Sequence, residues 1–360
     1  MVKETKEHNL IPKIWRSRRR SVLIVTLLAV IGLIILLALP PRVNKRSNTL
    51  KLPDNLETLT TENAQQLESF GELNEGALLA LRPNSSLLVV APFQAPAHIF
   101  DYETAESIYT FTEYPIGLVF SHDGNTAATT TFGNDINLLD TKSYLKIAHF
   151  EGYTEGHTDI ITALVFNPDG QWLASASFDK TIRIWDVTQK RGTAILRGHT
   201  DWVSDIAFSP DGKFLVSTSA DGTVRIWDTT IWKTVKVMSI KNTKALDVAY
   251  NPQGNVIAVA YTDHLIRFWS TQTGEVVGIL NGHTREVEEI SFSPDGRLLA
   301  STSLDMALRL WDVDELKSLR EITFQPILGL GSINFTPDGR LLLLNKNLST
   351  IEFWGVSATN

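Results

Sequence analysis

One set of residue types in this chain could do chemistry: a histidine, a serine, an aspartate and a tryptophan at fixed spacing. The set occurs three times, as His157, Ser177, Asp179 and Trp185; as His199, Ser219, Asp221 and Trp227; and as His283, Ser303, Asp305 and Trp311. Serine, histidine and aspartate together are the residues of hydrolytic triads. A hydrolase carries its triad once, however, whereas this set recurs in register and always includes an indole N–H. The repetition favours a structural role over catalysis.

No other motif in the sequence points to catalysis. The chain has no cysteine, which excludes disulfides, thiol catalysis and cysteine-ligated zinc. The remaining histidines lack the spacing of metal ligands; they are His8, His98, His122, His149 and His264. There is also no G-x-S-x-G turn, P-loop or dinucleotide fingerprint. We therefore expect a protein that is not an enzyme and that holds no cofactor and no metal.

The three sets belong to an internal repeat that fills the chain from about residue 65 onward. A turn dipeptide marks each repeat, beginning at Asn84, Asp123, Asp169, Asp211, Gln253, Asp295 and Asp338. Successive markers lie 39, 46, 42, 42, 42 and 43 residues apart, a period typical of four-stranded propeller blades. A large apolar residue follows each marker by sixteen residues, namely Phe100, Leu139, Trp185, Trp227, Trp269, Trp311 and Trp354. Seven markers in one shared register predict seven blades.

Three of the repeats resemble those of the WD-repeat family. They combine Gly156-His157 with Trp185-Asp186, Gly198-His199 with Trp227-Asp228, and Gly282-His283 with Trp311-Asp312. The fifth and seventh repeats keep only the tryptophan, and the first two keep neither signature. The resemblance covers residues 65–356 and is closest in style to bacterial WD-repeat proteins. It implies that each set is a buried tetrad that ties the turn between the second and third strands to the incoming loop.

The resemblance implies an all-β, seven-bladed propeller whose ring is closed by an N-terminal strand. Only six residues follow Trp354, too few for the last blade to gain a fourth strand. Residues 67–71 have the pattern of a fourth strand, and Gly71 precedes its marker by thirteen residues, as the glycines of the three Gly-His pairs do. We therefore predict that this strand completes blade seven, because an open propeller would expose two unpaired sheet edges.

Three carboxylates recur at one position of adjacent blades, and they are Asp205, Asp247 and Glu289. Each lies three residues before the aromatic residue that ends the first strand. Because first strands line the central channel of a propeller, these oxygens could bind calcium or magnesium there. The alternative, which we favour, is that they accept local backbone hydrogen bonds or remain solvated.

A partner is expected on the upper face, defined as the loops that enter the first strands together with the turns between second and third strands. In the WD-repeat family this face is a common contact surface. Blades one to four place large apolar side chains there, namely Phe93, Tyr114, Phe132, Ile160, Phe178 and Trp202. Exposed aromatic clusters are typical of interface hot spots, so we expect a protein or peptide to bind here. Alternatively, these side chains fill the loops of degenerate blades that lack tetrads.

The segment before the repeats is predicted to be a signal anchor. Residues 22–39 carry no charge, and as a helix they would reach about 27 Å, close to the hydrocarbon thickness. No convincing cleavage site follows, so we expect no cleavage, with a cleaved signal peptide as the alternative. Seven basic residues precede the span and four follow it, which places the N-terminus in the cytoplasm and the propeller outside. The predicted order is a basic segment (1–20), a transmembrane helix (21–40), a linker (41–64) and the propeller (65–360).

Charge separates these parts and limits the choice of partner. Residues 1–51 hold eleven basic and two acidic groups, which leaves 22 basic and 38 acidic groups and a net charge of −16 for the remainder. Because an acidic domain repels phosphates, we do not expect nucleic-acid binding. The sequence thus predicts a membrane-anchored, monomeric propeller that serves as a protein-binding scaffold. The alternatives are a propeller enzyme or divalent-metal-binding propeller that uses the channel carboxylates, and a scaffold that faces the cytoplasm.

Overall fold

The computed structural model describes residues 50–53, 55–92, 95–112, 115–130, 134–151, 156–325, 331–347 and 349–358. The predicted basic segment and the predicted transmembrane helix (21–40) lie outside these residues. Within the described part of the chain, no helix is long and apolar enough to cross a bilayer.

The described residues form seven four-stranded antiparallel sheets, which confirms the prediction of an all-β, seven-bladed propeller. Blade 1 contains β2 (Ala77–Leu81), β3 (Leu87–Ala91), β4 (His98–Asp101) and β5 (Glu106–Thr110). Blade 2 contains β6 (Gly117–Phe120), β7 (Thr126–Thr130), β8 (Ile136–Asp140) and β9 (Lys146–Phe150). Blade 3 contains β10 (Ile161–Phe166), β11 (Trp172–Ser177), β12 (Ile182–Asp186) and β13 (Arg191–Leu196).

The later blades follow the same order of strands. Blade 4 contains β14 (Val203–Phe208), β15 (Phe214–Ser219), β16 (Thr223–Asp228) and β17 (Lys233–Ser239). Blade 5 contains β18 (Ala245–Tyr250), β19 (Val256–Tyr261), β20 (Ile266–Ser270) and β21 (Val276–Leu280). Blade 6 contains β22 (Val287–Phe292), β23 (Leu298–Ser303), β24 (Ala307–Asp312) and β25 (Lys317–Thr323). Blade 7 contains β26 (Ile333–Phe335), β27 (Leu341–Asn347), β28 (Thr350–Gly355) and β1 (Glu68–Leu73).

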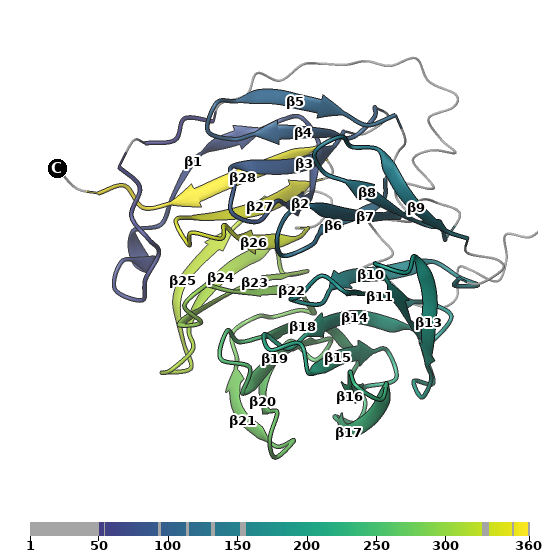
Figure 1. Ribbon diagram of the computed structural model, residues 1–360. Helices are drawn as coiled ribbons and strands as arrows, with labels where there is room; N and C mark the ends of the chain where they lie inside the picture. The colour runs from purple at the N-terminus through teal and green to yellow at the C-terminus, as the bar shows by residue number, and fades with distance from the viewer. Residues whose placement is uncertain are drawn as a thin grey trace, which may run out of the picture. The chain divides into compact units, whose positions relative to one another are not determined.

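The blades form a closed ring, as Figure 1 shows. First strands of successive blades contact one another from β2 and β6 through to β22 and β26, and β2 also contacts β27 and β28. The N-terminal strand β1 pairs antiparallel with β28, with Glu68 opposite Gly355 and Leu73 opposite Ile351. The prediction that an N-terminal strand completes blade seven is therefore confirmed.

The turns that mark the second to seventh repeats contain a glycine for two physical reasons. Gly254 has φ of +73°, a conformation that residues with a Cβ rarely adopt. A Cβ built there would also lie 3.2 Å from Cδ of Pro210, the proline of the equivalent turn one blade earlier. The marker glycine is thus required both by the turn and by the packing of one blade against the preceding one.

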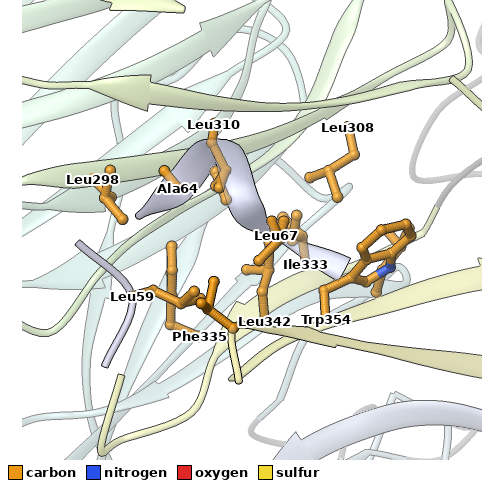
Figure 2. Packing of buried hydrophobic residues seen from close by; sticks show 13 residues of the cluster. Leu59, Ala64, Leu67, Leu298, Leu308, Leu310, Ile333, Phe335, Leu342 and Trp354 are labelled. Carbon is orange, nitrogen blue, oxygen red and sulfur yellow. The ribbon is translucent and has the colours of Figure 1, made fainter. Parts of the chain in front are cut away.

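The segment before β1 packs onto the propeller, which corrects part of the predicted linker 41–64. A 3₁₀ helix spans Ala64–Gln66, and Leu59, Ala64 and Leu67 are buried at 1%, 0% and 2% exposure. Figure 2 shows these side chains among Leu298, Leu310 and Leu342. The stretch looked like a linker because its apolar residues are isolated between polar ones, and only the three-dimensional structure brings them together over blades 6 and 7.

Candidate functional site

Each predicted tetrad forms a chain of hydrogen bonds from the third strand to the incoming loop. In blade 4, Trp227 Nε1 donates to Ser217 Oγ at 2.9 Å, and Ser217 Oγ lies 2.8 Å from His199 Nε2. His199 Nδ1 lies 3.2 Å from Asp221 Oδ2, which also accepts the backbone N–H of Thr200. Blades 3 and 6 repeat the chain with Trp185, Ser175, His157 and Asp179, and with Trp311, Ser301, His283 and Asp305.

The prediction that Ser177, Ser219 and Ser303 are the tetrad serines is wrong. The tetrad serine lies two residues earlier on the same strand, as Ser175, Ser217 and Ser301. Side chains two residues apart on a strand point to the same face, so spacing alone does not separate the two candidates. The pairing register of the strands separates them. Trp227 lies opposite Leu215, so Ser217 is the nearer of the two serines to its indole N–H, and Ser219 lies two residues further along the strand.

The serines at the strand ends hold the turn instead. Ser219 Oγ donates to the backbone carbonyl of Trp202 at 2.8 Å and accepts the backbone N–H of Asp221 at 3.1 Å. Ser177 and Ser303 likewise accept the N–H of Asp179 and of Asp305. Both serines of each blade therefore position the aspartate, one through the histidine and one through the turn.

The tetrad has one consistent placement of hydrogens. Burial would raise the pKa of Asp221, but hydrogen bonds from His199, from Thr223 and from the backbone lower it well below its ordinary value. Burial lowers the pKa of His199, so its ring is neutral. Since the ionised aspartate only accepts, Nδ1 carries the ring proton, Nε2 accepts, and the serine hydroxyl donates to it. Every donor in the network has an acceptor.

This connectivity is that of a hydrolytic triad, but it is closed to any substrate. Ser175, Ser217 and Ser301 are all 0% exposed. The indole N–H already occupies the serine oxygen on the side away from the histidine. A nucleophile must be within reach of the reacting carbonyl, and these oxygens are not. The tetrads are therefore parts of the framework.

Blade 5 lacks the histidine and the serine and uses a different network, which was not foreseen. Tyr261 stands where blade 4 has Ser219, and its hydroxyl accepts the indole N–H of Trp269 at 3.1 Å. Arg267 lies over the Tyr261 ring, 4.8 Å from its centroid, and donates to both carboxylate oxygens of Asp263. Burial raises the pKa of Tyr261, so the hydroxyl stays protonated. The signal in the sequence was that Trp269 keeps the shared repeat position of the tryptophan, while blade 5 has no serine to accept its indole N–H.

The channel carboxylates join neighbouring blades. Asp205 Oδ2 accepts the backbone N–H of Val248 in blade 5 at 3.2 Å, and Asp247 Oδ2 accepts that of Ile290 in blade 6 at 2.7 Å. The favoured alternative, backbone hydrogen bonding, is thus confirmed for these two residues, except that the donors belong to the next blade rather than to the local chain. Among the residues that the structure describes, no group of three or more histidine or carboxylate side chains is arranged to hold a metal ion.

The three carboxyls are harder to ionise than ordinary carboxyls. Burial raises the pKa of Asp205 well above its ordinary value, and the charge and the hydrogen bond of Asp247 raise it further. Burial also raises the pKa of Asp247, although its hydrogen bonds to Asp205 and to the backbone oppose this. For Glu289, burial and the charge of Asp247 raise the pKa well above the ordinary value.

The upper face is only partly as predicted. Phe93, Tyr114 and Phe132 lie outside the described residues. Ile160 and Phe178 are partly exposed, and the Phe178 ring packs against Trp202 with centroids 5.1 Å apart. Exposure of Trp202 was predicted wrongly, since its side chain is 6% exposed.

Trp202 is buried because the residues around it leave room for its ring. The ring packs in one buried cluster with Ala220 and Leu246. Ala220 is the residue directly after β15, and its backbone N–H donates to the carbonyl of Trp202. The indole Nε1–H has no hydrogen-bond acceptor among the residues that the structure describes. The sequence pattern places Trp202 on the upper face, but it does not show whether the ring turns outward or inward.

The ring of seven four-stranded sheets, with buried tetrads that end in a Trp-Asp pair, defines a WD-repeat β-propeller. Residues 115–360 match the family model described as "IFT122 first beta-propeller", and the chain belongs to this family of WD-repeat propellers.

Individual relatives match over shorter stretches. The chain is 41% identical to "Target of rapamycin complex subunit wat1" of Schizosaccharomyces pombe over 14% of this chain and 14% of that protein. It is 29% identical to "WD repeat-containing protein SL1-17" of Schistosoma mansoni over 31% of this chain and 37% of that protein. It is 41% identical to "WD repeat-containing protein 1" of Mus musculus over 19% of this chain and 11% of that protein. The matches thus span well under half the length of these curated relatives.

Proposed function

We propose that the protein is a membrane-anchored scaffold whose propeller binds a protein or peptide on its upper face. The observation that carries this proposal is the burial of the tetrads: the side chains that could do chemistry hold the blades together. Family membership supports the coarser part, because WD-repeat propellers generally bind protein partners and are typically not enzymes.

The upper face offers an apolar contact at blades 3 and 4. Ile160 and Phe178 keep part of their surface in solvent, and Trp202 supports Phe178 from below. The backbone N–H of Phe178 donates to the carbonyl of Ile160, so the two residues are fixed next to each other. A rigid aromatic on a supported loop loses little conformational entropy on binding, which is typical of interface anchors.

The test is capture of partners by the full-length chain after cross-linking in membranes, with identification by mass spectrometry. Phe178→Ala is expected to lose the partners that the unaltered protein captures, without loss of thermal stability. Phe214→Ala is the matched control, because that phenylalanine is 36% exposed at the start of β15, at the other end of the blade. Equal capture by Phe178→Ala and by the unaltered chain would refute binding at the upper face.

The anchor is the second part of the proposal. It is supported by the uncharged stretch 22–39 and by the excess of basic residues before it. In intact cells of the host, a tag placed at the C-terminus is expected to be open to externally added protease, and an N-terminal tag to be protected. Release of the protein from membranes by alkaline carbonate would argue against an uncleaved anchor, and protection of the C-terminal tag would argue for the cytoplasmic alternative.

A further inference from the structure

The outer strands of blades 3 and 4 are basic, although the domain is acidic. Residues 223–244, which include β16 and β17, hold five basic residues and one acidic residue. Residues 182–197, which include β12 and β13, hold four basic residues and one acidic residue. By contrast, residues 52–360 as a whole, including these two segments, hold 22 basic and 38 acidic groups. Positive charge is thus concentrated on one side of the propeller, away from the upper-face residues of the proposed function.

The outermost strand of blade 4 also exposes aliphatic side chains. Val235 and Val237 are each 51% exposed, and they alternate with Lys236 and Met238, whose side chains face the other way. Lys236 Nζ donates to the backbone carbonyls of Thr271 and of the residue after it, which holds that side of β17 against blade 5. The valine side is therefore the side left open to solvent.

The solvent-exposed side of β17, which carries Val237, faces blade 3. Val237 lies opposite Arg225 in the ladder between β16 and β17, and residues opposite each other share a face of the sheet. Arg225 donates to the carbonyl of Gly198, in the loop that follows β13. The exposed valines thus lie between the outer strands of two blades that both carry excess positive charge.

The edge of β17 is available for pairing. Among the described residues β17 pairs only with β16, and it is the last strand in the order of its sheet, as Figure 1 also shows. It has seven residues, whereas the outer strands of blades 1, 2 and 5 have five. The ladder between β16 and β17 has a bulge at Val235, so an added strand would pair with the regular part of β17 from Lys236 to Ser239. A long edge strand with exposed β-branched residues can take up another strand in this way.

Blades 1 and 6 lack this combination. In blade 6 the position opposite Arg309 is Glu321, and the two form an ion pair at 2.9 Å. In blade 1 Ile108 is 50% exposed, but β4 and β5 contain acidic residues and no lysine or arginine. Blade 3 has a smaller version, because Ile195 of β13 is 43% exposed opposite Arg183. Exposed aliphatic residues and unbalanced positive charge therefore coincide at β13 and β17, and β17 exposes two such residues, Val235 and Val237.

We propose that an acidic, extended segment of a partner protein adds to the edge of β17 as a fifth strand of blade 4. Its apolar side chains lie against Val235 and Val237, and its carboxylates lie near Lys233 and Lys241, both of which are exposed. An anionic membrane surface would match the charge, but it would not use the unpaired backbone groups of an edge strand, so the strand is favoured. The strand contacts of this site, Val235 and Val237, lie outside the upper face, although Lys241 belongs to the loop that enters β18. The valine variants therefore test the site independently of the proposed function.

The first experiment measures binding of a fluorescent peptide of alternating valine and glutamate to the full-length chain by anisotropy. The peptide is expected to bind, more weakly as salt is raised, whereas a peptide of alternating valine and lysine does not bind. Combining Lys233→Glu with Lys241→Glu is expected to weaken binding by about tenfold. Equal binding of the two peptides, or binding unaffected by the charge reversal, would overturn the proposal.

The second experiment locates the contact. Val235→Thr with Val237→Thr keeps the β-branched shape and removes apolar surface, so binding is expected to weaken while the fold is retained. Ile108→Thr is the matched control at the equivalent position of blade 1, with nearly the same exposure, and should bind normally. Hydrogen exchange should show protection of the β17 amides when the peptide is bound. Protection elsewhere but not in β17 would contradict strand addition.

The third experiment separates the membrane alternative. The full-length chain in detergent is mixed with vesicles of phosphatidylcholine with and without phosphatidylserine. Strand addition predicts that the charge-reversed variant and the unaltered chain show the same dependence on phosphatidylserine, because the basic residues before residue 52 are common to both. If association depends on phosphatidylserine and on Lys233 and Lys241, and the acidic peptide does not compete, the surface is a lipid contact and the proposal is wrong.

Discussion

At the scale of single residues, burial decides what a serine, a histidine and an aspartate can do. Ser217, His199 and Asp221 are connected as in a hydrolase, yet the serine is 0% exposed and accepts an indole N–H. At a surface these donors and acceptors could activate a nucleophile. Inside a blade they satisfy one another's hydrogen bonds. Residue types and spacing are therefore compatible with both roles, and accessibility separates them.

The identity of the tetrad serine can be tested by comparing Ser217→Ala with Ser219→Ala. The first change leaves the indole N–H of Trp227 and Nε2 of His199 without a partner in a buried site, and is expected to cost about 2–3 kcal/mol of unfolding free energy. The second removes a hydroxyl that is also 0% exposed but that bonds two backbone groups of the turn, the carbonyl of Trp202 and the N–H of Asp221, and is expected to cost about 1–2 kcal/mol. Urea unfolding measures both.

Exchange of the Trp227 indole proton, followed by NMR, provides the control for this comparison. It should accelerate in Ser217→Ala and remain slow in Ser219→Ala, because only Ser217 accepts that proton. A larger loss of stability in Ser219→Ala, with the indole proton still protected in Ser217→Ala, would restore the serine first predicted.

At the scale of strands and blades, the sequence predicted those features that depend on backbone register. The repeat period and the marker turns were sufficient for seven blades, and the strand pattern of residues 67–71 with the spacing of Gly71 was sufficient for the closing strand. The register does not predict whether a given side chain points into the core or into solvent. Trp202 turns inward over Ala220, and Leu59 packs between blades although its sequence neighbours are polar. Both outcomes depend on residues that are distant in the sequence.

The contact between blades 4 and 5 makes stability depend on pH. Asp205 has a pKa raised by burial and by Asp247, above the value it has in an unfolded chain. Its contribution is therefore fully present at pH below the unfolded value and is lost as pH rises through the folded value. Asp205→Asn can still accept the N–H of Val248 and can donate to Asp247 without a titrating proton.

We therefore expect Asp205→Asn to be more stable than the unaltered protein at neutral and alkaline pH by about 1 kcal/mol. This corresponds to a rise in Tm of about 2–4 °C, and the difference should shrink or reverse in acid. Thermal unfolding across pH measures it. Glu275→Gln, an exposed change at the outer side of the same blade 5, should follow the unaltered protein. A constant difference at all pH values would show that titration of Asp205 does not control this contact.

At the scale of the whole propeller, charge and structure distinguish two surfaces for which we propose different partners. The upper face combines partly exposed Phe178 and Ile160 with buried support from Trp202. The edge of β17 combines exposed valines with lysines. The tetrads and channel carboxylates lie between these surfaces and fix them relative to each other, so two partners could bind one rigid body.

That rigidity depends on closure of the ring by β1, which supplies the last strand of blade 7. Leu73 is 0% exposed and packs with Leu343 and Phe353, and Ser69 Oγ donates to Glu352 at 2.9 Å. Deletion of residues 1–73 would remove this strand and leave the edge of β28 unpaired, so we expect self-association through that edge. Deletion of residues 1–49 is the control and should remain monodisperse in size-exclusion chromatography with light scattering. Adding a peptide of residues 56–73 should restore the shorter chain to the behaviour of the control, because it supplies the missing strand together with the buried Leu59 and Leu67. A chain without residues 1–73 that stays monodisperse and unfolds at the same temperature as the control would show that β1 is not what closes the ring.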